Sequence, residues 1–139
     1  MGTARRFEDL EVWRAARDLA REIYKMANHG SFRRDFGLRD QITRAATSTM
    51  SNIAEGFERG SRKEFVQFLT IAKASNGEVR SQLYVALDQQ YLDELTFTQL
   101  HKTTLLLSRR LATFIAYLEG FPQNSRRKRS PDVAVTWNL

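Results

Sequence analysis

Two long helical patterns meet at one short turn in residues 38–87, LRDQITRAATSTMSNIAEGFERGSRKEFVQFLTIAKASNGEVRSQLYVAL. Gly56 and Gly60 bracket the end of the first pattern. Ser61 and Glu64 form a capping box, in which each side chain satisfies a backbone N–H at the start of the next helix. The stretch therefore predicts two helices joined by a tight turn. The first helix would have a slim surface that a neighbour can approach closely, because it carries the small residues Ala45, Ala46, Ser48, Ser51 and Ala54.

Four segments of the chain repeat apolar residues at spacings of three and four, which is the period of a helix with one buried face. They cover about 8–27, 37–57, 62–90 and 96–119, and Thr96 with Gln99 forms a second candidate capping box. Between the first two segments we expect a polar, exposed connection that includes Arg33 and Arg34. The expected core consists of Val12, Trp13, Ala16, Leu19, Ala20, Ile23, Met26, Leu38, Ile42, Ala45, Thr49, Ile53, Phe65, Leu69, Ala72, Val79, Leu83, Ala86, Leu100, Thr104, Leu107, Leu111, Phe114 and Leu118.

These patterns predict an all-α domain. The chain has 139 residues, of which 42% are hydrophobic and 27% charged, as is ordinary for one globular domain. Short connections leave consecutive helices side by side, so we expect an antiparallel up-down-up-down four-helix bundle over residues 1–121. Residues 122–139 are rich in polar and basic residues with two prolines, and we expect a flexible basic tail there. Within that tail Val133, Val135 and Trp137 alternate in a way that suits docking against a partner. For Trp137 the alternatives are packing on the bundle, stacking on a base, or no role.

Several apolar residues lie outside the four stripes. They are more than the interior of one bundle needs, and the alternative is that they are scattered surface residues, which are common. Doublets on several helices favour contact with another subunit. The residues concerned include Tyr24, Tyr84, Val85, Leu105, Leu106 and Tyr117.

Five short motifs together resemble a known family. They are FEDLEVWRAARDLA from Phe7, FGLRDQITRAA from Phe36, SNIAEGFERGSRKEF from Ser51, FLTIAKAS from Phe68, and Glu78 followed by Gln82 and Leu83. The chain resembles the small four-helix-bundle proteins encoded within 23S rRNA intervening sequences, whose relatives accompany the reverse transcriptase of diversity-generating retroelements. The resemblance implies a ring-like homopentamer with a role in nucleic-acid binding. It also implies that a protein such as a reverse transcriptase is a candidate partner.

Residue usage argues against several classes of protein. The chain has no cysteine, which rules out disulfides, thiolate metal sites and a cysteine nucleophile and fits a reducing cytoplasm. No apolar run approaches the roughly 18 residues of a spanning helix, so we expect no membrane association. The basic start of the chain leads into no apolar run either, unlike a signal peptide. We therefore expect a cytoplasmic protein.

Catalytic signatures are equally sparse. His29 and His101 have no carboxylate in the Glu-x-x-His spacing of di-iron bundles. No serine occupies a nucleophile elbow, and Gly56 and Gly60 form no phosphate-binding loop. The sequence thus predicts a non-enzymatic protein without a metal or cofactor.

Glu55 and Glu78 are the strongest candidates for a pair of facing carboxylates, because they lie on neighbouring helices beside the small residues. The structural alternative carries more weight. Glu55 is placed to pair with Arg59 one turn later, or to accept hydrogen bonds from Asn52 or Ser75. We treat seven residues as a structural motif, and they are Asn52, Glu55, Gly56, Ser61, Glu64, Ser75 and Glu78.

The distribution of charge is the feature that indicates which partners the protein could bind. The net charge is +6, and the tail after Glu119 holds four basic residues against Asp132, so half of the excess lies there. A second group of cations lies at the turn between the two central helices. If five copies assembled, both groups would repeat around the ring and contact one polyanion at many points. The predicted nucleic-acid-binding residues are Arg59, Arg62, Lys63, Arg126, Arg127, Lys128 and Arg129.

Both basic groups also have simpler interpretations. Cations at a helix start are often solvated surface, and a basic tail is often a nonspecific arm. Within the nucleic-acid interpretation, the chain lacks a helix-turn-helix, a zinc finger and an RNP motif, so binding of RNA or DNA would rest on phosphates and weaken as salt rises. The alternative hypothesis is a scaffold module whose basic turn and tail recruit an acidic protein.

Overall fold

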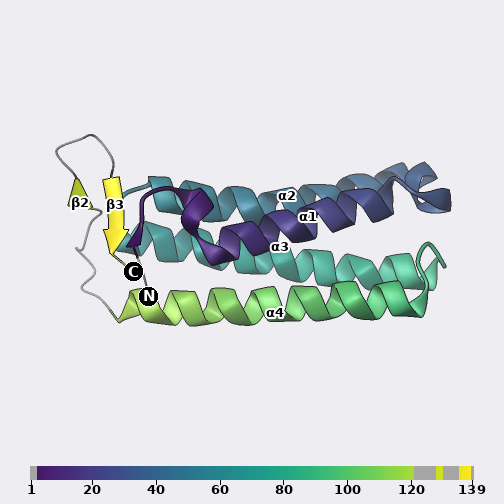
Figure 1. Ribbon diagram of the computed structural model, residues 1–139. Helices are drawn as coiled ribbons and strands as arrows, with labels where there is room; N and C mark the ends of the chain where they lie inside the picture. The colour runs from purple at the N-terminus through teal and green to yellow at the C-terminus, as the bar shows by residue number, and fades with distance from the viewer. Residues whose placement is uncertain (1–2, 121–127, 130–134, 139) are drawn as a thin grey trace.

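The computed structural model describes residues 3–120, 128–129 and 135–138, and four long helices make up most of them. The helices are α1 (Glu11–Ala27), α2 (Phe36–Glu58), α3 (Arg62–Asp88) and α4 (Glu94–Glu119). Consecutive helices run antiparallel and pack side by side, and α1 also contacts α4 (Figure 1). The predicted four-helix bundle is confirmed.

Short elements close the two ends of the bundle. Two 3₁₀ helices, η1 (Phe7–Asp9) and η2 (Gly30–Arg34), precede α1 and α2. A small antiparallel sheet has the strand order β1 (Thr3–Ala4), β3 (Val135–Asn138), β2 (Lys128–Arg129). The sequence patterns predicted no strand. In Figure 1 the sheet lies where α2 ends and α3 begins, and both chain ends lie nearby.

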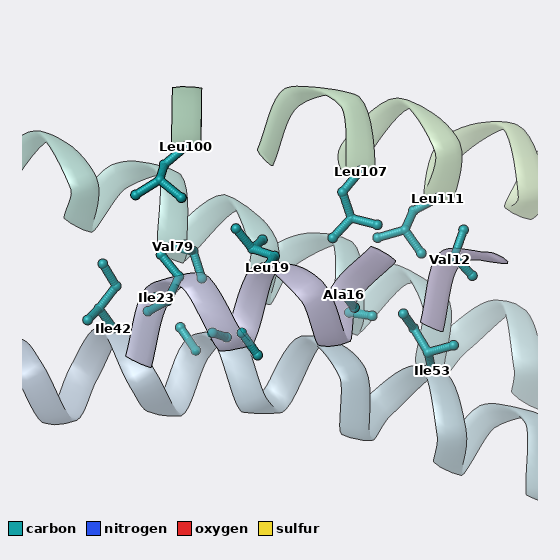
Figure 2. Close-up of a cluster of buried hydrophobic side chains, with 14 of the residues drawn as sticks. Val12, Ala16, Leu19, Ile23, Ile42, Ile53, Val79, Leu100, Leu107 and Leu111 are labelled. Atoms are coloured by element: carbon teal, nitrogen blue, oxygen red, sulfur yellow. The ribbon is translucent and has the colours of Figure 1, made fainter. Parts of the chain in front are cut away.

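The core runs along the bundle axis between the four helices. Side chains from every helix meet there, as Figure 2 shows for Ile23 of α1, Ile42 of α2, Val79 of α3 and Leu111 of α4. Every residue of the predicted core is buried except Trp13 and Met26, which are partly buried and pack against the rest. Helical periodicity was sufficient to identify this core because each helix faces it with one stripe.

The connection between α1 and α2 differs from the prediction. It was expected to be polar and exposed, but Phe32 is fully buried, and its ring centroid lies 5.0 Å from that of Tyr91 after α3. Tyr91 also donates its hydroxyl to Asp35 Oδ2 at 2.9 Å, while Asp35 Oδ1 caps α2 by accepting from the Leu38 N–H. A single aromatic residue among polar ones has no periodicity, so its burial could not be predicted from the sequence.

Helix capping follows the prediction for α3 and departs from it for α4. Ser61 Oγ accepts from the Glu64 N–H at 3.2 Å, which is one of the two hydrogen bonds of the predicted capping box. The second predicted box, Thr96 with Gln99, is wrong. Helix α4 begins at Glu94 because Asp93 is its N-cap and accepts from the Thr96 N–H at 2.7 Å. This hydrogen bond favours the charged carboxylate and lowers the pKa of Asp93.

Candidate nucleic-acid interface

The turn between α2 and α3 places cations at one end of the bundle. Arg59 caps α2, and Gly60 follows with a φ of +87°, a left-handed conformation that glycine adopts without steric cost. Ser61 then starts α3 at once. Because the turn is so short, Arg59 and Lys63 both remain on the surface.

Arg59 is held by two contacts on the surface. Its Nη2 lies 3.4 Å from Glu55 Oε1, and its guanidinium lies 5.0 Å from the ring centroid of Phe68 on α3. The ion pair is half exposed, so it contributes at most about 1 kcal/mol to stability. The guanidinium therefore stays accessible to a polyanion while the aromatic ring restricts its position.

Arg62 differs from the other two cations of the turn. It is only 7% exposed, and this burial lowers its pKa. Its predicted contact with phosphate remains untested, but burial disfavours it. The reason is geometric: Arg62 lies on the same face of α3 as Phe65 and Leu69, which are fully buried.

Part of the basic tail lies at the same end of the bundle. Lys128 and Arg129 form β2, whereas Arg126 and Arg127 lie outside the described residues. Strand β2 pairs with β3, and β3 pairs with β1 through Thr3 with Asn138 and Ala4 with Trp137. Strand β3 thus lies between β1 and β2, and the backbone of Lys128 and Arg129 is placed at the end of the bundle that carries the α2–α3 turn (Figure 1). The predicted flexibility of the remaining tail lies outside the described residues.

The SNIAEG motif holds α2 against α3. Asn52 Nδ2 donates to the Ser48 carbonyl oxygen at 2.8 Å and to Ser48 Oγ at 3.0 Å, and the Ser48 hydroxyl lies 3.1 Å from that of Ser75 on α3. Gly56 is buried, and a Cβ added there would lie 2.7 Å from Phe68 Cβ. These contacts lie where α2 packs against α3. Asn52 and Ser75 were predicted as alternative donors to Glu55, but both contact Ser48 instead.

The two carboxylates of the motif are exposed. Glu55 pairs with Arg59, which was one of its predicted partners, and Glu78 lies on the outer face of α3. Among the residues that the structure describes, no cluster of His, Asp and Glu is arranged to hold a metal ion.

Two polar features escaped the sequence analysis. Asn76 is fully buried within α3 and donates to the Thr104 carbonyl oxygen of α4 at 2.8 Å. His101 Nε2 lies 3.1 Å from the hydroxyl of Tyr84, and the rings of Tyr84, Phe97 and His101 pack together on the surface. Both features depend on the rotation of α4 relative to α3, which a single stripe does not specify.

No helix in the described part of the chain is both long and apolar enough to cross a membrane. No curated protein matches the chain. A solved structure from Bacteroides thetaiotaomicron VPI-5482, a protein of unknown function from the S23 ribosomal protein family, matches with a TM-score of 0.68. The match has 23% identity and covers 75% of this chain and 97% of the other, so it supports the fold. The model of the 23S rRNA-intervening sequence protein family matches residues 8–113, and the chain therefore belongs to this family.

Proposed function

We propose that this protein is a non-enzymatic, oligomeric helical bundle that binds structured RNA or DNA through one basic end. The observation that carries the proposal is the placement of two cationic groups. Arg59 and Lys63 are exposed at the α2–α3 turn, and β2, with Lys128 and Arg129, lies at the same end of the bundle. The chain as a whole has a net charge of +6, which favours association with a polyanion.

Such binding is driven by the phosphate backbone. Each lysine or arginine that neutralises a phosphate releases condensed counterions, so affinity falls as salt concentration rises. Direct readout of bases in a groove needs an inserted helix or strand, and the candidate cations here belong to a turn and to a strand of only two residues. The proposed binding is accordingly selective for the shape of the nucleic acid rather than for its sequence.

Oligomerisation would strengthen weak contacts of this kind. Four of the apolar residues outside the predicted stripes, Tyr24, Tyr84, Val85 and Leu106, are exposed, as a subunit interface requires. The family resemblance implies a ring-like homopentamer, which would carry a charge of +30 and repeat the basic end five times. Linked sites reach an avidity far above that of one site when a single ligand spans them. We extend the proposal to an accessory role beside ribosomal RNA or a reverse transcriptase.

The test is a salt titration of binding to a labelled structured RNA and a DNA duplex. The variant Arg59→Glu/Lys63→Glu reverses the exposed charges of the turn, and Arg33→Glu/Arg34→Glu makes the same change at the opposite end. We expect the first variant to lose at least about tenfold in affinity near 0.1 M salt and to flatten the salt dependence by about one unit per lost contact. The second variant should bind nearly as the wild type does.

Equal behaviour of the two variants would remove the turn from the interface. A third variant, in which Arg126, Arg127, Lys128 and Arg129 are all changed to Gln, separates the folded end from the tail without deleting β3. If that variant alone lost all binding, the protein would carry only a nonspecific basic arm. Absence of binding at low salt would favour the scaffold hypothesis, in which the same cations recruit an acidic protein.

A further inference from the structure

A cavity of about 550 Å³ opens between the N-terminal segment, α1 and α4. Its volume lies in the range of small-ligand sites. Four buried apolar residues, each at most 6% exposed, form its wall, and they are Ala4, Leu10, Val12 and Phe114. Polar residues complete the lining, and they include Asp9, Glu11, Arg14, Arg109, Arg110 and Thr113. The cavity thus joins an apolar wall to a charged surround.

The charged groups around the cavity differ in whether they already have partners within the protein. Asp9 Oδ2 accepts from the backbone N–H groups of Arg5 and Arg6 at 3.0 and 3.1 Å. Glu11 Oε1 lies 3.5 Å from Arg110 Nη1. Arg109 is exposed and forms no ion pair with any residue that the structure describes. The carboxylates are therefore satisfied within the protein, and Arg109 remains to attract an anion.

The cavity lies near the proposed interface. The ring centroid of Phe114 is 5.4 Å from that of Phe65, which belongs to the first turn of α3 and follows Lys63 by two residues. Thr3 and Ala4 of β1 line the cavity and also pair with β3. Figure 1 shows the start of α3, the second half of α4 and the sheet at the same end of the bundle. A nucleic acid bound at the turn and β2 would pass close to the cavity.

We propose that this cavity receives an unpaired nucleotide of the bound nucleic acid. The base would pack against the wall formed by Leu10, Val12 and Phe114, and the adjoining phosphate would contact Arg109. Proteins recognise single-stranded segments through unstacked bases on apolar or aromatic surfaces beside cations, whereas bases inside a duplex are not available. The inference rests on the proposed function and adds a preference for an unpaired segment.

The experiment compares a blunt RNA hairpin with the same hairpin carrying a three-nucleotide single-stranded overhang. Thr113→Phe fills the cavity from an exposed position of α4, and Ala112→Phe adds the same ring at the neighbouring exposed position, which does not line the cavity. We expect the overhang to raise the affinity of the wild type and of Ala112→Phe about fivefold to tenfold. Thr113→Phe should bind both RNAs as the wild type binds the blunt hairpin.

A second pair of variants tests the anion contact without adding bulk. Arg109→Gln should lose most of the gain from the overhang, and Lys102→Gln, an exposed change on the same helix away from the cavity, should keep it. The inference is overturned if the overhang adds nothing to wild-type binding, or if Thr113→Phe and Ala112→Phe respond equally. Either result, with the blunt hairpin still bound, leaves the proposed function in place. If neither RNA binds, the proposed function fails and this inference fails with it.

Discussion

Gly56 is the point at which α3 tolerates no side chain on α2. A Cβ there would lie 2.7 Å from Phe68 Cβ, 3.1 Å from Phe65 Cδ1 and 3.3 Å from the Phe65 carbonyl oxygen. Phe68 Cβ and the Phe65 carbonyl oxygen are fixed to the backbone of α3, so the two helices would have to separate. We predict that Gly56→Ala lowers the free energy of unfolding by about 1–3 kcal/mol, which is the usual cost of overpacking a core. Urea denaturation measures the loss.

Gly77 provides the matched control for this substitution. It also lies inside a helix, but a Cβ added there would have nothing within 4 Å. Gly77→Ala should therefore stabilise the protein by up to about 1 kcal/mol, because alanine favours the helical backbone more than glycine does. Equal effects of the two substitutions would show that Gly56 acts through backbone freedom and not through close packing.

Individual residues were predictable where they repeat with the helical period. The core stripes belong to this class, and so does the close approach at Gly56, since small residues on one helix and an aromatic pair on the next leave few other arrangements. Phe32 and Arg62 do not belong to this class. Phe32 is buried by a 3₁₀ turn that has no periodic signature, and Arg62 is buried because its position on α3 outweighs its charge.

At the scale of elements, one hydrogen bond connects the two turns at the far end of the bundle. Tyr91 follows α3, and its hydroxyl donates to Asp35, the N-cap of α2, at 2.9 Å. This bond raises the pKa of Tyr91. We predict that Tyr91→Phe destabilises the protein at neutral pH, because Asp35 loses a donor while it still caps α2. The matched control is Tyr24→Phe, whose hydroxyl has a longer, exposed contact of 3.4 Å with Thr47 and should matter less.

The effect of Tyr91→Phe should depend on pH. A folded-state pKa above the unfolded value of 10.0 means that the folded protein holds this proton more tightly. The stability that Tyr91 contributes is therefore complete below pH 10 and is lost as pH rises through the folded-state pKa. Unfolding measured from pH 7 to 11 should show the wild type and the variant converging at the alkaline end. A constant difference would mean that the hydrogen bond between Tyr91 and Asp35 is not the source of the stability that the hydroxyl contributes.

Helix ends were predictable when a cap and a break coincided in the sequence. Ser61 after Gly60 identified the start of α3 to the residue, whereas Thr96 was predicted as the N-cap of α4 and lies three residues after the observed N-cap, Asp93. The carboxylate of Asp93 accepts the hydrogen bond from the Thr96 N–H at 2.7 Å, so α4 begins earlier and is longer than predicted. The strands had no such signal, since β1 and β2 hold two residues each, and β1 pairs with β3 across almost the whole length of the chain.

In the whole molecule, the fold brings together residues that lie far apart in the sequence. Arg14 and Arg109 lie far apart along the chain, and only the antiparallel contact of α1 with α4 brings them to one cavity. The two basic groups were each visible as short runs of cations. Their placement at one end of the bundle depends on the pairing of β3 with β1, so the folded chain was needed to describe them as one surface.

The outer face of α3 is where we expect subunits of the proposed ring to meet. Ile71 and Val85 are 48% and 44% exposed, and they lie fourteen residues apart, which places them on the same side of the helix. We predict that the wild type has a native mass near 80 kDa, five times 16.1 kDa, and that Ile71→Glu/Val85→Glu dissociates it, because ten carboxylates would be buried at the interfaces of one ring. Light scattering coupled to size-exclusion chromatography measures the mass.

A control for added charge comes from α4. Thr98→Glu/Thr103→Glu introduces the same two carboxylates at exposed positions of that helix and should leave the native mass unchanged. Dissociation by this variant instead would move the interface to α4, and a wild-type mass of 16.1 kDa would remove the ring itself. The dissociated α3 variant then separates avidity from intrinsic affinity, since it keeps Arg59, Lys63 and the cavity. If binding by repeated weak contacts is correct, its affinity for a long structured RNA should fall at least a hundredfold, while its affinity for a short hairpin changes little.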